Sequence, residues 1–551
     1  MSRWGIRVMP GLLLILRRLF VLSALMLPGT CDLGQLASAQ EAGDQRTFER
    51  LTDKQYRAAF AEFLPQGFRP SYLKVEVVGN TDYYSLVMTV PETPIDCHAN
   101  HLLTREQFQS LDTQYLNRGF RRLVHQRYVL SNIERHAVVW IRPSLSRPTG
   151  IIWDTADEIP ASGKTSRYLE PIDRMLSQFM FDHQVPGATM AISRNGQIVY
   201  QRGFGYRQLE NERVMEPDTL LRIASVSKPV TAAAIMQLVD RGQMELDQPL
   251  FADLHKLTAV EFDPRWQAIT LDHLLRHRAG WDRVESFDPM FRQHVIARHF
   301  QVQIPVEPEM IMRYMLEHPL QHDPGRQFAY SNFGYSVLGR AIERASEMTY
   351  QQYVVENVFR PLGIRGARVG RTRFDERDRK ESCYYPRDGR FAEHSRIDAQ
   401  VFDVPVQYGG WYQESLDAHG GLIATAADLV RFASSFDQPD QCPIMSSEAV
   451  REMFLPVNLD EIELDEQGIR QFYAYGWQVV ALDDGERFNC YHMGRLPGSS
   501  AILVRRHDGF NWAVLFNSDN SADGQRLASR IDPLIHQAVD AVTRWPNRNQ
   551  R

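Results

Sequence analysis

The stretch "LRIASVSKPVTAAAIMQLVDRG", from Leu221 to Gly242, decides how the rest of the chain is interpreted. It predicts a helix that begins near a serine, carries a lysine three positions later and is otherwise apolar. Three residues make almost one helical turn, so Ser225 and Lys228 share a helix face. Ser225 is therefore either an ordinary helix cap or a nucleophile, and Lys228 is either a solvated charge or the base that takes its proton.

The residues around Lys228 favour the second alternative, in which Ser225 is a nucleophile and Lys228 is its base. The run "TAAAIMQLV" predicts that the helix is buried after the lysine, which partly desolvates the ammonium. Burial and nearby positive charge both lower a lysine pKa and make the amine a usable base. The helix N-terminus in turn favours negative charge on the Ser225 oxygen. Ser-x-x-Lys alone is a weak signal, so the argument needs further motifs.

Two later stretches supply them. In "FAYSNFGYSVLGRAIE", Tyr330 and Asn332 stand where a loop enters an apolar helix, so the tyrosine hydroxyl and the amide can face a substrate. In "YHMGRLPGSSAILV", His492 opens a strand, and Gly494 and Gly498 allow a ligand to approach the backbone closely. Each stretch alone equally fits a packed tyrosine with a capping asparagine, or a turn into an edge strand.

In this order, Ser-x-x-Lys, Tyr-x-Asn and His-x-Gly resemble the serine β-lactamase and penicillin-binding protein superfamily, in its class C-like branch. That branch also contains D-amino-acid peptidases and carboxylesterases. The resemblance spans roughly residues 168–540. Three further segments are similar to family segments: "LLRHRAGW", "HGGLIATAADLVRF" and "AYGWQV".

The resemblance implies an α+β, β-lactamase-like fold for residues 168–545, in which helices flank an antiparallel sheet beside an all-helical region. The local patterns agree. The strands "GATMAIS" and "QIVYQRGFGY" meet at a hairpin signal, Arg194-Asn195-Gly196, and "SAILVRR" and "NWAVLFNS" form a second strand pair near a C-terminal helix.

The resemblance also implies a mechanism of two-step acyl transfer without a metal or cofactor. Ser225 attacks a carbonyl, while Lys228 and Tyr330 manage its proton. The N–H groups of Ser225 and Arg495 form the oxyanion hole, and Asn332 and His492 orient the substrate. The substrate-binding residues implied are Asn332, His492, Gly494 and Arg495.

Two positions depart from the family pattern. His492 stands where the third motif most often has lysine, and Met493 stands where it has a hydroxyl residue. Histidine there is frequent in the esterase and peptidase members. The missing hydroxyl removes a donor for a β-lactam carboxylate, which argues against penicillin hydrolysis.

The segment before residue 150 contains an internal duplication. "LTDKQYRAAFAEFLPQGFRP", from Leu51, and "LTREQFQSLDTQYLNRGFRR", from Leu103, match at a constant offset of 52 without a gap. Each copy predicts a Thr-capped helix followed by two strands, so residues 45–150 form a small α+β tandem-repeat domain. The copies resemble the repeat that precedes the hydrolase domain in polyglycine hydrolases. We expect a spacer or a contact with a cell-wall or extracellular polymer.

Between the copies lies "CHANH", with Cys97, His98 and His101. It is either a polar loop, which we expect, or part of a metal site that lacks an obvious fourth ligand. Residues 151–167, rich in Pro, Gly, Ser and Thr, predict a linker to the large domain.

Residues 1–39 predict a cleavable signal peptide, since four arginines, a short apolar run and "ASA" follow one another. An uncleaved anchor and lipid attachment at Cys31 are the alternatives. We therefore expect a secreted or periplasmic protein. Cleavage would leave a formal charge of about −9, which gives no reason to expect nucleic acid as a partner. The four remaining cysteines suit either disulfides or isolated thiols; they are Cys97, Cys383, Cys442 and Cys490.

Three functions follow as hypotheses. The first is a secreted serine hydrolase that cleaves an ester or peptide bond in a small molecule or peptide. The second is a β-lactamase or D-Ala-D-Ala cell-wall peptidase. The third is a non-catalytic binding protein on the same fold, because a fold does not by itself fix an activity.

Overall fold

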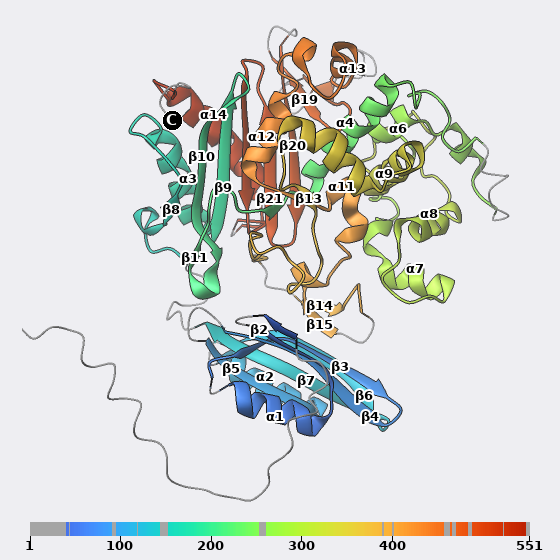
Figure 1. Ribbon diagram of the computed structural model, residues 1–551. Coiled ribbons are helices and arrows are strands. Elements are labelled where there is room, and N and C mark those ends of the chain that lie inside the picture. The colour runs from blue at the N-terminus through green and yellow to red at the C-terminus, as the bar shows by residue number, and fades with distance from the viewer. Residues whose placement is uncertain are drawn as a thin grey trace, which may run out of the picture.

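The computed structural model describes residues 40–42, 45–64, 66–90, 95–117, 120–143, 152–252, 261–387, 391–398, 402–456, 463–464, 470–482, 487–521 and 523–546. A small domain of sheets and helices, built from the repeats, lies beside a large domain that contains the rest (Figure 1). The expected signal peptide, residues 1–39, lies outside the described residues. Within these ranges, none of the helices combines the length and the apolarity needed to cross a bilayer.

Each repeat folds as a strand, a helix and two further strands. The first contains β2 (Gln45–Leu51), α1 (Asp53–Phe63), β3 (Arg69–Val78) and β4 (Thr81–Thr89), with β1 (Gln40–Ala42) paired to β2. The second contains β5 (Ile95–Leu103), α2 (Arg105–Asn117), β6 (Arg121–Leu130) and β7 (Ile133–Pro143). The sequence predicts the helix and the last two strands of each copy. It misses β2 and β5, whose charged and histidine side chains hide the strand pattern.

The predicted threonine cap is present in both copies. In the first, Thr52 Oγ1 accepts from the N–H of Gln55, and the Gln55 side chain accepts from the N–H of Thr52 at 3.0 Å. Thr104 and Gln107 repeat the arrangement at 3.3 and 2.9 Å. Such a capping box satisfies N–H groups that the first helical turn leaves free, so it fixes where each helix begins.

The "CHANH" segment lies in β5, so the expected polar loop is wrong. Successive side chains of a strand point to opposite faces. Cys97 packs toward the core that the two repeats share, whereas the ring of His98 stacks on Tyr115 of α2 with centroids 4.5 Å apart. His101 contacts Asp53 of the first repeat. The three side chains do not converge on one point. None of the four described cysteines forms a disulfide.

Among the described residues of the large domain, ten strands form one antiparallel sheet. Its order is β11-β10-β9-β22-β21-β20-β19-β18-β17, and β8 pairs with β10. The first strands are β8 (Ala161–Ser162), β9 (Gly187–Arg194), β10 (Gln197–Gln208) and β11 (Arg213–Val214). The later strands are β17 (Glu463–Leu464), β18 (Arg470–Tyr473), β19 (Gln478–Ala481), β20 (Phe488–Leu496), β21 (Ser499–Arg505) and β22 (Phe510–Phe516). Both predicted hairpins are therefore present in a single sheet.

Two helices from opposite ends of this domain cover one face of the sheet. They are α3 (Glu170–His183) and α14 (Leu527–Ala541). Leu176 of α3 and Ile531 of α14 pack in one apolar core with Trp512 of β22. These side chains are withdrawn from water, which favours the sandwich. The predicted α+β, β-lactamase-like architecture is confirmed.

A helical region lies on the other side of the sheet (Figure 1). Its helices are α4 (Ser227–Asp240), α6 (Leu271–Leu275), α7 (Gln293–Phe300), α8 (Pro308–Leu316), α9 (Asn332–Ser346), α10 (Tyr350–Tyr353), α11 (Asp417–Gly420), α12 (Ala426–Ser434) and α13 (Ser447–Glu452). A small sheet leads into α4; it consists of β12 (Leu221–Arg222), β13 (Arg368–Val369) and β16 (Leu422–Ala424). Nearly every residue of α4 is buried, as its apolar sequence predicts.

The structure corrects the prediction that residues 151–167 form a linker. Residues 152–162 of this segment pack on the large domain, whereas residues 163–167 are exposed. Trp153 is 1% exposed, and its Nε1 donates to the carbonyl oxygen of Val185 at 2.7 Å. Ser162 of β8 donates through Oγ to the carbonyl oxygen of Met215 at 2.6 Å. Its Pro, Gly and Ser content reflects turns, whereas Trp153 and Ile159 provide the buried surface that holds it.

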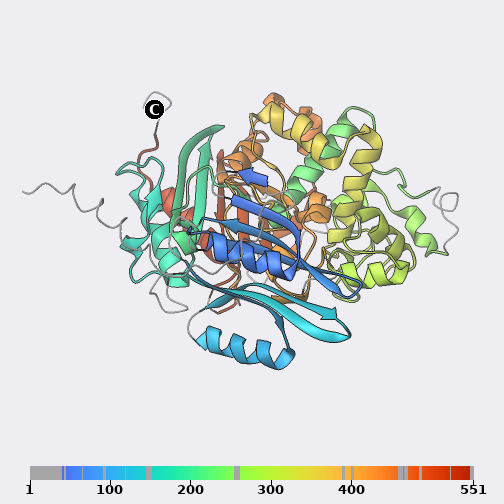
Figure 2. The same cartoon turned by 60° about the horizontal axis from the view of Figure 1, so that its bottom comes forward.

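Polar contacts join the two domains. The hairpin of β14 (Phe391–His394) and β15 (Phe402–Pro405) projects from the large domain toward the repeats (Figure 1). In Figure 2, with the bottom turned forward, the repeat domain lies in front of the large domain. Arg373 donates to the hydroxyl of Tyr72 at 3.1 Å, and Arg121 forms an ion pair with Glu210 at 2.6 Å. The repeat domain is thus docked on the large domain rather than simply tethered to it.

Candidate active site

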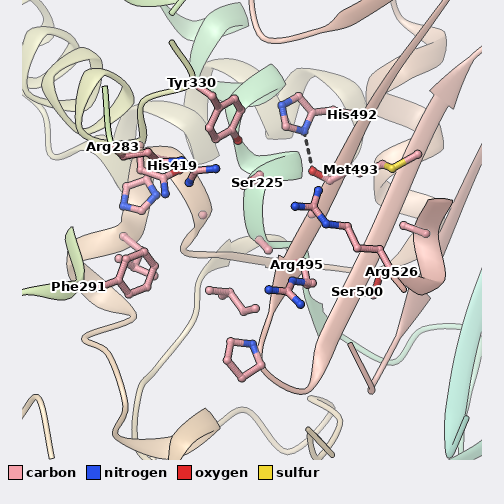
Figure 3. Close-up of a pocket in the computed structure, with 18 residues that line it drawn as sticks. Ser225, Arg283, Phe291, Tyr330, His419, His492, Met493, Arg495, Ser500 and Arg526 are labelled. Carbon is pink, nitrogen blue, oxygen red and sulfur yellow. Dashed lines mark hydrogen bonds between the residues drawn. The ribbon is translucent and has the colours of Figure 1, made fainter. Parts of the chain in front are cut away.

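A cavity of about 450 Å³ lies where β20 meets the helical region (Figure 3). Six of the seven residues predicted to form the site line it: Ser225, Tyr330, Asn332, His492, Gly494 and Arg495. The seventh, Lys228, lies behind Ser225 and contacts it. Segments more than 260 residues apart in the sequence therefore meet at one point, as the three motifs predict.

Ser225 lies in η4 (Ala224–Val226), a short 3₁₀ turn that runs directly into α4. Ala224 has a φ of +47°, in the left-handed region that non-glycine residues rarely adopt. Ser227 holds this turn, because its Oγ donates to the Ala224 carbonyl at 2.7 Å and accepts from the N–H of Leu422 at 3.3 Å. The turn thereby presents Ser225 at the cavity wall.

Lys228 is fully buried and makes three polar contacts. Its Nζ lies 3.3 Å from Ser225 Oγ, 2.9 Å from Asn332 Oδ1 and 2.7 Å from the carbonyl oxygen of His419. Burial, helped by the charge of Arg283, lowers the pKa of Lys228 well below 10.5. The neutral amine has a lone pair that can accept the Ser225 proton, so the contact suits a nucleophile and its base.

Tyr330 is enclosed by charged and aromatic groups. Lys228 Nζ lies 4.8 Å from the centre of its ring, the guanidinium carbon of Arg283 lies 4.7 Å away, and the His277 ring lies 4.3 Å away. Burial raises the pKa of Tyr330 to about 12, although its hydrogen bond with Ser225 acts in the opposite direction. Tyr330 is therefore a protonated phenol at neutral pH. It is suited to donate a proton rather than to begin the reaction as a base.

Asn332 begins α9, and Ser331 caps that helix by accepting from the N–H of Gly334 at 3.1 Å. Both polar atoms of the Asn332 side chain are occupied. Oδ1 accepts from Lys228, and Nδ2 donates to Asp288 Oδ2 at 2.6 Å. In this arrangement Asn332 positions the lysine, and the second N–H of Nδ2 can still donate to a substrate, as the role expected from the sequence requires.

His492 is 5% exposed, and both of its ring nitrogens are engaged. Nδ1 lies 2.9 Å from the carbonyl oxygen of Met493, and Nε2 lies 3.0 Å from the hydroxyl of Tyr473. A carbonyl can only accept, so Nδ1 carries the proton and Tyr473 donates to Nε2. Burial and the charge of Lys228 lower the pKa of His492 to about 3. His492 is thus a neutral packing group without a free nitrogen for substrate, contrary to the sequence expectation.

The strand that carries the third motif approaches the serine very closely. In the described residues, β19 pairs with β20 only as far as Tyr491, so the rest of β20 has no strand on that side. There Gly494 packs against η4, and a Cβ at this position would lie 2.1 Å from the carbonyl oxygen of Ile223. Only glycine, which has no Cβ, therefore lets β20 approach η4 this closely. The main chain of Arg495, the next residue of β20, lies beside η4, the turn that carries Ser225.

The sequence identifies the other cavity residues less clearly as parts of a site. His419 opens the segment "HGGL", which resembles a family segment, and its carbonyl holds Lys228. Arg283, Phe291 and Arg526 also line the cavity (Figure 3). These three lie in loops or at a helix end, where no periodicity marks them.

Comparisons with known proteins agree with this geometry. The sequence model of the beta-lactamase family matches residues 172–535. The polyglycine hydrolase-like structural repeat matches residues 46–89 and 95–143, which are the two copies described above.

Individual relatives carry hydrolase or penicillin-binding names. Penicillin-binding protein 4* of Bacillus subtilis is 26% identical over 327 residues, which cover 59% of this chain and 66% of that protein. Esterase EstB of Burkholderia gladioli is 30% identical over 214 residues, which cover 38% of this chain and 53% of the esterase. The chain thus spans between about half and just under two thirds of these relatives' length.

A solved structure matches over the same region. The octameric penicillin-binding protein homologue of Pyrococcus abyssi superposes with a TM-score of 0.51 at 26% identity, covering 67% of this chain and 77% of that one. The match of the family model over residues 172–535 extends across more than half of the sequence. This chain belongs to the beta-lactamase family, and its homologues in that family are serine hydrolases.

Proposed function

We propose that the protein is an exported serine hydrolase that forms an acyl-enzyme on Ser225 and cleaves an ester or amide bond. The observation that carries this proposal is the 3.3 Å contact between Ser225 Oγ and Lys228 Nζ, together with the burial that lowers the lysine pKa. A neutral amine beside a hydroxyl at a cavity wall is the arrangement that a lysine-activated serine requires.

In the first half-reaction, Lys228 Nζ takes the Ser225 proton while Oγ forms a bond to the substrate carbonyl carbon. The N–H groups of Ser225 and Arg495 hold the resulting oxyanion. Tyr330 then donates its phenolic proton to the departing alcohol or amine, and recovers a proton from the Lys228 ammonium. In the second half-reaction water attacks the acyl-enzyme while neutral Lys228 takes its proton, and the Lys228 ammonium returns a proton to Ser225 Oγ as the acyl–Oγ bond breaks and the acid is released.

The direct test is labelling with a fluorophosphonate, which reacts with activated serines. We expect one label per chain on the peptide that contains Ser225, and none on Ser225→Ala. Full catalytic activity in Ser225→Ala would refute the proposal. Absence of label on wild-type protein would favour the third hypothesis, a non-catalytic binding protein.

The second hypothesis, a β-lactamase or D-Ala-D-Ala peptidase, is supported by the name of the Bacillus relative. It is opposed by Met493, which occupies the position of the third-motif hydroxyl. Nitrocefin turnover or covalent labelling by penicillin would favour this function over the general hydrolase.

Export rests on the character of residues 1–39, and N-terminal sequencing of the protein recovered outside the cytoplasm tests it. We also propose that the repeats hold the protein on a cell-wall or extracellular polymer. Their match to the polyglycine hydrolase-like repeat supports an accessory role. Co-sedimentation of full-length Ser225→Ala with purified cell-wall sacculi tests this contact without cleavage of the polymer.

A further inference from the structure

A carboxylate outside the cavity lining contacts two of the residues that form it. Oδ2 of Asp288 accepts from Nδ2 of Asn332 at 2.6 Å and lies 3.6 Å from the Arg283 guanidinium. Asn332 and Arg283 line the cavity, whereas Asp288 is not one of its described lining residues. Figure 3 shows Arg283 on the same side of the cavity as Tyr330, whose ring it overlies. One carboxylate is therefore shared by two residues of this wall.

Asp288 is held in turn by its own segment. It is the N-cap residue of η6 (Pro289–Phe291), and its Oδ1 accepts from the N–H of Met290 at 3.1 Å. Such a bond satisfies a backbone donor that the first turn leaves free. Met290 is fully buried and Phe291 lines the cavity, so this turn is packed into the molecule. With Oδ1 engaged by the turn, Oδ2 is presented to Asn332.

The bond to Asp288 decides which way the Asn332 amide faces. A carboxylate only accepts hydrogen bonds, so the NH2 group points to Asp288 and the amide oxygen points to Lys228 Nζ, 2.9 Å away. The reversed amide would set its oxygen against the carboxylate oxygens and its NH2 group against the amine. Asp288 therefore disfavours the reversed amide.

This orientation controls the lone pair of Lys228. A neutral amine has two N–H groups and one lone pair. Two carbonyl oxygens accept the N–H groups of Nζ, Asn332 Oδ1 and the main-chain oxygen of His419 at 2.7 Å. The lone pair is then left for the hydroxyl of Ser225, whose Oγ lies 3.3 Å away. If the Asn332 amide were reversed, its NH2 group would compete with Ser225 for that lone pair.

Asp288 also contributes to the charge around the amine. Burial is the main cause of the low pKa of Lys228; the charge of Arg283 lowers this pKa further, and the charge of Asp288 raises it. The other titratable groups near Lys228 are uncharged at neutral pH, because burial raises the pKa of the tyrosines and lowers that of the histidines. They are Tyr330, Tyr335, His277, His419 and His492.

From these contacts we propose that Asp288 is a positioning residue, which holds the Asn332 amide so that the lone pair of Lys228 is directed at Ser225. This inference rests on the proposed function and adds a residue that acts on the nucleophile through Asn332 and Lys228.

The first test is a double-mutant cycle, with kcat/KM for p-nitrophenyl butyrate measured at pH 8. Asp288→Asn keeps the shape of the side chain, but it removes the charge and lets the Asn332 amide turn. We expect it to lower kcat/KM by about tenfold, because a hydrogen bond to a charged group is lost. In an Asn332→Ala background the same substitution should change kcat/KM by less than about twofold, since the group through which Asp288 acts is absent.

The second test exchanges the two side chains. Asn332→Asp alone sets two carboxylates against each other and should be strongly impaired. In Asp288→Asn/Asn332→Asp the new amide donates to the new carboxylate, whose other oxygen still accepts from Lys228. We expect this double variant to exceed Asn332→Asp by about fivefold or more in kcat/KM. Because its charge lies beside the amine, its activity should fall at a higher pH on the acid side than that of Asp288→Asn.

Asp282→Asn is the matched control. Asp282 lies in the same loop and loses the same charge, but it is paired with His322 at 3.4 Å. Its bond from the N–H of Val284, at 2.7 Å, can be kept by an amide oxygen. We expect kcat/KM of this variant to stay within about twofold of the wild-type value.

The inference is overturned if Asp288→Asn has the same effect with and without Asn332, or if Asp282→Asn impairs the enzyme equally. It is also overturned if the exchanged pair is no more active than Asn332→Asp, or if its acid limb coincides with that of Asp288→Asn. The exchanged pair decides the question if Asp288→Asn alone is unstable. Fluorophosphonate labelling of Ser225 is measured on every variant. Labelled wild-type protein with any of these outcomes removes only the role of Asp288, whereas no labelling of the wild type removes the proposed function itself.

Discussion

Tyr473 donates to Nε2 of His492 at 3.0 Å, while the other ring nitrogen of His492 faces the Met493 carbonyl at 2.9 Å. The two bonds fix the tautomer and leave the imidazole uncharged. His492 therefore acts on Ser225 through packing of β20 rather than through proton transfer. This separates it from Lys228, whose pKa is lowered but whose amine contacts the nucleophile directly.

Substitution of His492 should leave the pH dependence intact. Because its pKa is about 3, His492 is neutral throughout the range above pH 5 and contributes no ionisation there. We expect His492→Gln to lower kcat/KM but to keep the pH at which activity falls on the acid side. A shift of that midpoint by a full pH unit or more would mean that His492 titrates. The measurement is kcat/KM for a p-nitrophenyl ester between pH 5 and 9.

Lys228 should account for the acid limb of that profile. The amine is active when neutral, so activity is lost as the pH falls through its lowered pKa and the ammonium forms. We expect Lys228→Met to reduce kcat/KM by about 10²–10⁴-fold, the usual contribution of a general base, and to remove the acid limb. Lys380→Met is the control, since Lys380 is exposed and paired with Asp218. A profile with the same limb in Lys228→Met would assign the base elsewhere.

Tyr330 should matter most for poor leaving groups. Its pKa of about 12 keeps the phenol protonated, which suits protonation of a departing alkoxide or amine. A p-nitrophenolate leaves without a proton. Tyr330→Phe should therefore slow hydrolysis of an alkyl ester or amide about tenfold more than that of the matching p-nitrophenyl ester. Equal losses for both substrates would instead indicate that Tyr330 acts in the attack by Ser225.

Gly494→Ala tests the contact between β20 and the nucleophile turn. The added Cβ would lie 2.1 Å from the Ile223 carbonyl oxygen, so the strand must move away from Ser225 and Arg495. We expect fluorophosphonate labelling to slow by about 10²-fold, as for loss of an oxyanion donor. Gly366→Ala is the control, because its nearest neighbour would be 3.5 Å away. Labelling at the wild-type rate in Gly494→Ala would show that this approach is not needed.

Substitutions of Trp153 test where the large domain begins. Its side chain is 1% exposed and packs in the core with α3. Trp153→Ala should lower the free energy of unfolding by about 3–5 kcal/mol. Trp153→Phe, which keeps an aromatic ring but loses the bond to Val185, should cost about 1 kcal/mol. Urea unfolding followed by activity measures both. A change below 0.5 kcal/mol in Trp153→Ala would restore the interpretation of this segment as a linker.

The sequence predicts those features of the molecule that depend on residues close together in the chain. In such features a residue type at a given spacing has a single structural interpretation. Ser225 and Lys228 are one turn apart, so their contact follows from helical geometry. The duplication at offset 52 gives two equivalent units without any knowledge of their packing. Thr52 and Gln55 mark a helix start because their side chains satisfy free N–H groups locally. Each of these signals depends on neighbours in the chain.

The remaining features depend on residues that are distant in the chain. Nothing near Tyr473 or Met493 shows that their polar groups would take both nitrogens of His492. Arg283 and Arg526 reach the cavity only because a loop and the start of α14 meet there. The composition of "CHANH" predicts a loop, whereas its pairing with β7 makes this segment part of strand β5. Burial of Trp153 likewise requires α3 and the turn at Val185.

Ser225 lies in the turn before α4 and Lys228 in the first turn of α4, which has a consequence for how the protein unfolds. Helix α4 is buried along almost its whole length, so it has no solvent-facing side from which to fray. Inactivation by heat or denaturant should coincide with global loss of structure, and backbone amides of α4 should exchange with deuterium among the slowest in the molecule.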